Sequence, residues 1–236
     1  MDENRPKLSP EQALEQWRKQ VPGEGILRGV AVISGMAPGP GQAISAYISG
    51  KLSDIDRRRL EELMDSTVDE MARTSRRLNL EFLKKDDFAD LSREIGEKVI
   101  RERNADKRKF YRNILLGAVL SQDIDPYDEA MKYSRTLEAL QPVHVHVLRA
   151  VSIEIPEREL WNRDGIGGFM MGELKKRLPE LPETQITEIL EDLNNERLTK
   201  FRIDSLMLGM SGSSAANLRT RVTEYGHKFV GFVLRG

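Results

Sequence analysis

Apolar residues recur every three or four positions through much of residues 52–155, which is the spacing of amphipathic helices. The first such run extends from Ile55 towards Leu78 and predicts one long helix. A second run follows Asp87, a residue type that commonly caps the first turn of a helix. The pattern therefore predicts a helical body over residues 52–155.

The second run is expected to continue through the charged residues 101–109 into an apolar stretch, Leu115–Leu120, that should be buried. Asp125 and Pro126 predict a further helix start, because proline suits the first helical position. Residues 52–110 hold fifteen basic and fifteen acidic side chains. This balance favours solvated helix faces with salt bridges, and a nucleic-acid-binding ridge is the alternative.

The helical period continues in the last third of the chain. One helix is predicted over residues 169–178 and a second over 182–195, with Pro179 and Pro182 bounding the turn between them. The second helix has one apolar stripe, formed by Ile186, Ile189, Leu190 and Leu193. Asn194 and Asn195 should end it, since asparagine tolerates the left-handed conformation of a helix cap.

After Lys200 the period changes to two, which predicts a strand over residues 201–207. The small, polar residues 209–217 predict a flexible hairpin tip. A second strand should follow over 218–222, and Thr223 should cap a last helix.

This order of elements, together with the ending Val222-Thr223-Glu224-Tyr225-Gly226-His227-Lys228-Phe229, resembles the C-terminal winged helix of many bacterial regulators and uncharacterised bacterial proteins. The resemblance covers less than a third of the chain. It implies a mainly α protein in which a helical body precedes a C-terminal winged helix with a two-stranded hairpin. The expected divisions are an N-terminal helical arm (1–24), a Gly/Pro-rich apolar segment (25–51), the helical body (52–155) and a winged-helix-like domain (156–236).

Charge decides what such a domain is expected to bind. DNA-binding relatives place the second helix in the major groove, where phosphates repel acidic side chains. Residues 182–200 carry five acidic and two basic side chains. We therefore expect a regulatory or adaptor protein that docks a protein partner, and a DNA-binding transcriptional regulator is the alternative. The candidate binding face consists of Lys175, Lys176, Arg177, Arg219 and Arg221.

Residues 29–50 contain no charged side chain. A membrane-spanning helix needs about twenty mostly apolar residues, but the run Pro38–Gly41 divides the segment. A buried or partner-covered turn is the favoured interpretation, and a membrane-active effector is a second alternative. The apolar candidates for a membrane or partner contact are Val30, Val32, Ile33, Ile44, Tyr47 and Ile48.

No catalytic or metal-binding pattern stands out. The chain has no cysteine, which excludes disulfides, thiolate zinc sites and cysteine nucleophiles. His144 and His146 would share a face of a strand, but a zinc site needs a third ligand such as Glu154 or Asp164. The serines at 211, 213 and 214 lack the Gly-x-Ser-x-Gly pattern. We expect no enzymatic activity, no cofactor and no metal.

The remaining expectations concern location and assembly. The charged N-terminus is not followed by a signal-peptide core, so a cytoplasmic protein is expected. A homo-oligomer is possible, with the long helix 54–79 as its predicted contact. Membrane association is not the favoured interpretation.

Overall fold

The computed structural model describes residues 53–73, 79–83, 85–121, 125–156, 159 and 167–234. The predicted N-terminal arm and the uncharged segment 29–50 lie outside the described residues. The described residues are mainly helical, as the sequence predicts. They belong to two compact units, which divide between Arg135 and Thr136.

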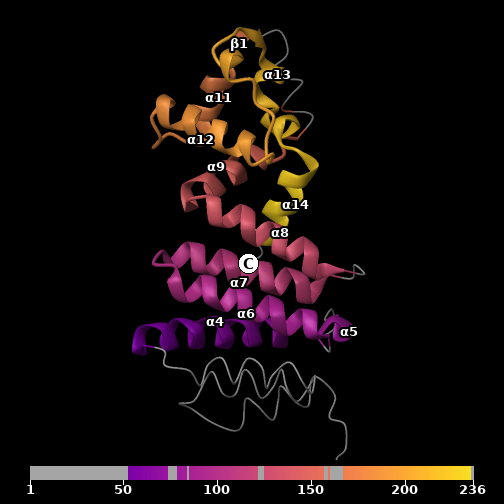
Figure 1. Cartoon of the computed structure of the whole chain (residues 1–236). Coiled ribbons are helices and arrows are strands. Elements are labelled where there is room, and N and C mark those ends of the chain that lie inside the picture. Colours follow the sequence, from indigo (N-terminus) through magenta and orange to yellow (C-terminus); the bar gives the residue numbers. More distant parts are fainter. Residues whose placement is uncertain are drawn as a thin grey trace, which may run out of the picture. The chain divides into compact units, whose positions relative to one another are not determined.

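The first unit is a helical bundle. It contains α4 (Asp54–Arg73), α5 (Leu80–Leu83), α6 (Asp86–Arg101), α7 (Ala105–Leu120) and most of α8 (Pro126–Ala139). Helices α4, α6 and α7 pack against one another, and α5 packs against α6 and α7 (Figure 1).

The core of this bundle follows the helical period. The predicted stripe of α6 is buried, and so is most of the apolar patch on α7. The rings of Phe82 and Phe88 form a T-shaped, edge-to-face pair, with their centroids 5.8 Å apart. Ile55 is an exception to the prediction, since its side chain is 64% exposed on the first turn of α4.

The predicted continuation of helix through residues 101–109 is wrong. Helix α6 ends at Arg101, and α7 begins at Ala105. Asn104 caps α7 because its side-chain oxygen accepts hydrogen bonds from the N–H groups of Asp106 and Lys107. Local capping therefore outweighs the helical propensity of the charged run.

The second unit has shorter elements. Its helices are α9 (Pro142–Ser152), α11 (Met170–Arg177), α12 (Glu183–Asn195), α13 (Gly212–Ala216) and α14 (Glu224–Val233). Two 3-10 turns, η2 (Ile203–Ser205) and η3 (Leu218–Arg221), lie between them. The strands β1 (Gly167–Gly168) and β2 (Met210–Ser211) pair antiparallel. Helix α9 packs against α11, α12 and α14.

The two predicted helices before Lys200 are confirmed, and the predicted stripe of α12 is buried. The end of α12 differs from the prediction, because Arg197 is the left-handed residue, with φ 60°. The N–H of Leu198 bonds to the carbonyl of Leu193, and that of Arg197 to the carbonyl of Asn194, so the helix ends in a Schellman motif. Asn194 instead holds the exit segment, since its side chain bonds to both backbone groups of Phe201.

The predicted two-stranded hairpin over residues 201–222 is not observed. Within the described residues, the pairing between these two ends is limited to an isolated bridge of Thr199 with Val222. Ser211 caps α13 by accepting a hydrogen bond from the N–H of Ser214, and Ala215 and Ala216 are buried. The small residues that suggested a flexible tip therefore form a capped, packed helical turn.

The last helix is confirmed, together with its cap. The hydroxyl of Thr223 accepts from the N–H of Gly226 and donates to the carbonyl of Arg197, 2.7 Å away. A Cβ atom at Gly226 would overlap the carbonyl oxygen of Leu198. The Thr-x-x-Gly ending therefore allows α14 to start in direct contact with the backbone that leaves α12.

Candidate functional site

The predicted basic face is used largely for internal contacts. The Lys175 ammonium donates to the carbonyls of Pro179 and Leu181, which fixes the turn after α11. The Arg177 guanidinium donates to the carbonyl of Ala150 at 2.8 Å and to that of Ala216 at 2.9 Å. Arg177 thereby bonds the C-terminal ends of two other helices, where backbone carbonyls lack helical partners.

The other three basic residues are divided among different contacts. Lys176 is exposed and lies 2.6 Å from a carboxylate oxygen of Glu173. Arg219 lies 2.5 Å from Glu154, just beyond the end of α9. The backbone carbonyl of Arg221 accepts from the N–H of Lys200, while its side chain is half-buried. The structure brings Arg177 and Arg219 to the same end of α9, where both side chains contact other residues of the second unit.

The histidine pair lies on helix α9, so the two side chains point in different directions. His144 is buried, and its Nε2 lies 3.0 Å from a carboxylate oxygen of Asp192 on α12. Its Nδ1 accepts from the N–H of Gln141, so the proton lies on Nε2, which donates to Asp192. His146 is exposed. No group of three or more metal-ligating side chains is found in the described part of the chain.

A feature that the sequence analysis missed is a group of exposed apolar side chains in the second unit. Phe169, Met207 and Leu208 are 51%, 60% and 58% exposed. We call these three residues the apolar patch.

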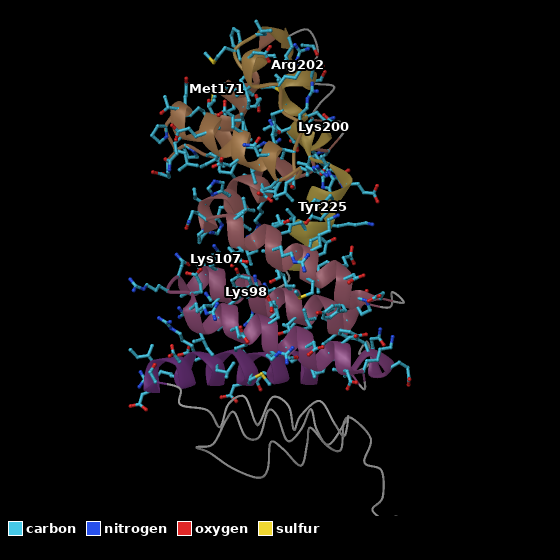
Figure 2. All side chains as sticks on the ribbon, in the orientation of Figure 1. Lys98, Lys107, Met171, Lys200, Arg202 and Tyr225 are labelled. Carbon is cyan, nitrogen blue, oxygen red and sulfur yellow. The ribbon has the colours of Figure 1, made fainter. Side chains whose placement is uncertain are left out.

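Backbone contacts bring the two segments of the apolar patch together. Phe169 directly follows β1, and Met207 and Leu208 precede β2, which pairs with it. The N–H of Met171 donates to the carbonyl of Leu206, and an added Cβ on Gly209 would lie 3.9 Å from the Phe169 ring. Figure 2 shows Arg202 on the segment that leads into the patch.

The sequence pattern concealed this patch because a period of two placed Met207 in the interior. The chain instead turns at η2, so that Phe201 and Leu206 are buried while Met207 and Leu208 face solvent. The sequence signal for the patch was the apolar pair Met207-Leu208 directly before a glycine, because glycine favours a turn at this point over a strand.

The exposed surface of α12 is acidic. Its exposed charged residues are Glu183, Glu188, Glu191 and Asp192, and the helix contains no lysine or arginine. This surface would be repelled by a nucleic-acid backbone.

None of the described helices has the length and apolar character needed to cross a bilayer. The candidates Val30, Val32, Ile33, Ile44, Tyr47 and Ile48 lie outside the described residues.

Comparison with known proteins adds no assignment. No protein-family model matches the chain, and searches of curated proteins and of solved structures find no match.

Proposed function

We propose that the second unit is a protein-docking module of a regulatory or adaptor protein that catalyses no reaction. In this proposal α11, α12 and α14 correspond to the helices of a winged helix, and short helical turns replace the strands of the wing. The apolar patch is the contact surface for an apolar segment of the partner protein.

The observation that carries the proposal is the exposure of three large apolar side chains on two adjoining segments. Single exposed apolar residues are ordinary, whereas neighbouring ones commonly mark an interaction surface. Aromatic residues and methionine are also enriched at protein interfaces. The patch therefore has the composition of a protein contact.

Charge supports a protein partner over a nucleic acid. The helix that would enter a DNA groove exposes acidic side chains, and Lys175 and Arg177 bond to backbone carbonyls within the unit. A basic surface is the first requirement for a nucleic-acid-binding domain. The acidic surface of α12 instead suits a partner with basic residues beside its apolar segment.

The test is affinity purification of the full-length chain from its native host, with Met207→Lys and Leu208→Lys combined in one variant. We expect one or more partners to be retained by the natural chain and lost with the variant, because charged groups at the centre of an interface are costly to desolvate. Mass spectrometry of the retained proteins measures this.

The matched control is Ile153→Lys, which makes the same type of change at a side chain of similar exposure in the same unit. It should leave partner retention intact. The docking proposal is contradicted if both variants lose partners equally, or if neither does. Retention of DNA by the natural chain, lost on changing Arg219 and Arg221 to glutamate, would instead support the transcriptional-regulator alternative.

A further inference from the structure

The first unit contains a cavity of about 220 Å³ between α4, α6 and α7. Leu63 and Val99 are the buried apolar residues of its lining. The other lining residues are polar or small: Arg59, Glu62, Ser66, Ala105, Arg108, Lys109 and Arg112.

Four cationic side chains and one carboxylate line this cavity, although residues 52–110 as a whole hold equal numbers of basic and acidic side chains. Arg59 comes from α4, whereas Arg108, Lys109 and Arg112 come from α7. The balanced charge of residues 52–110 predicted solvated helix faces and did not place Arg59 beside Arg108. The fold brings them to one cavity, where a bound anion would offset the repulsion between the like charges.

The arginines are held in place by their own hydrogen bonds. Nη1 of Arg59 donates to the carbonyl of Ile100 at 2.5 Å, and Nη1 of Arg108 to that of Arg103 at 2.9 Å. Arg112 donates through Nε and Nη2 to the side-chain oxygen of Asn113. Within the described part of the chain, these bonds leave Nη2 of Arg59 and of Arg108 as donors for a ligand.

The start of α7 adds to the positive potential. Ala105 is the first residue of this 16-residue helix and lines the cavity. A helix N-terminus carries a partial positive charge, although the Asn104 side chain already accepts from the N–H groups of Asp106 and Lys107. Asp106 offsets part of this charge but is paired with Lys109, at 3.6 Å. Lys107, labelled in Figure 2, is buried beside Glu102 and is not part of the lining.

We propose that this cavity binds a small anion of the phosphate class, with Arg59 and Arg108 as hydrogen-bond donors and with Lys109 and Arg112 as further positive charges. Phosphate oxygens match the planar donor arrangement of guanidinium groups. Drug-sized ligands generally occupy pockets of about 300–1,000 Å³, so this smaller cavity suits an inorganic phosphate or pyrophosphate. The site is separate from the apolar patch and does not depend on the docking proposal.

The test is calorimetric titration of the full-length chain with sodium pyrophosphate at low ionic strength, with variants of opposite expected effect. Ala105→Glu should weaken binding about tenfold, because it places a carboxylate at the cavity while remaining favourable in the first turn of a helix. Lys109→Gln should weaken binding about threefold, and Glu62→Gln should tighten it about threefold. Loss of folding cannot explain tighter binding.

The matched control is Thr184→Glu, which makes an equal charge change in the first turn of α12 in the second unit. It should leave pyrophosphate binding unchanged. The proposal is overturned if no saturable binding is found or if Ala105→Glu and Thr184→Glu have equal effects. It is also overturned if sodium chloride, added to the same ionic strength as the pyrophosphate, abolishes binding. Binding of a DNA or RNA oligonucleotide without binding of pyrophosphate would also overturn it.

Discussion

Apart from the four-residue α5, the described helices of the first unit have 14 to 20 residues and bury apolar stripes against one another, whereas the second unit is assembled from helices of 5 to 13 residues and very short strands. Long helices satisfy most of their backbone groups internally, but each short element leaves a larger share of N–H and C=O groups at its ends. The second unit therefore depends more on side chains that bond to the backbone of other elements.

Three residues of the second unit illustrate this dependence. Arg177 bonds to the carbonyls that end α9 and α13, Asn194 holds both backbone groups of Phe201, and Thr223 bonds to the carbonyls of Arg197 and Leu198. Arg177 and Thr223 connect elements that are distant in sequence, and Asn194 fixes the segment that leaves α12. We expect substitutions at such connecting positions in the second unit to be poorly tolerated even where little apolar area is lost.

The largest effect is expected for Gly226→Ala. The added Cβ would overlap the carbonyl oxygen of Leu198 and lie 2.8 Å from Cγ1 of Val222. The same carbonyl accepts hydrogen bonds from the N–H and the hydroxyl of Thr223, so it cannot move without weakening the start of α14. We expect a loss of about 3 kcal/mol in the stability of the second unit. Hydrogen exchange of peptides from α12 and α14 measures it.

Gly231→Ala provides the control on the same helix, because a Cβ there meets nothing within 4 Å. Since alanine has a higher helix propensity than glycine, this variant should be more stable by up to about 1 kcal/mol. Equal destabilisation by both substitutions would show that α14 does not depend on its close approach to Leu198.

A smaller loss is expected for Arg177→Lys, which keeps the charge but removes the planar group that reaches two carbonyls. A lysine ammonium can bond at one of these positions, so the carbonyl of Ala150 or of Ala216 loses its donor. We expect a loss of about 2 kcal/mol in the stability of the second unit, measured by the same exchange experiment. Lys176→Arg, at the exposed neighbouring position, should change stability little.

The contrast between the units also explains what could be predicted from the sequence. The stripes of α6 and α12 were predicted correctly because burial on one face imposes a period of 3.6 residues. The break at residues 102–104 and the turns in residues 201–222 were missed, since they depend on single capping side chains such as Asn104 and Ser211.

The candidate sites were harder to predict than the helices. Lys175 and Arg177 look like a binding surface in the sequence, and only the fold shows which carbonyls they contact. Conversely, Arg59 and Arg108 lie far apart in the sequence and line one cavity. Periodicity predicts which face of a helix is buried, but not which residues of different helices meet.

The smallest effects are expected when one hydroxyl is removed from each unit. The two removals should change stability in opposite directions. The Ser134 hydroxyl in the first unit is buried and has no hydrogen-bond partner in the described part of the chain, so Ser134→Ala should raise stability by about 1 kcal/mol. Thr223→Ala in the second unit should lower stability by about 1 kcal/mol, because its hydroxyl caps α14 and bonds to the carbonyl of Arg197. Urea unfolding followed by hydrogen exchange of each unit measures both changes. Thr223→Ser retains the hydroxyl and should recover most of the loss. A loss of stability on Ser134→Ala would mean that the first unit also depends on specific polar contacts, and the distinction between the two units would then fail.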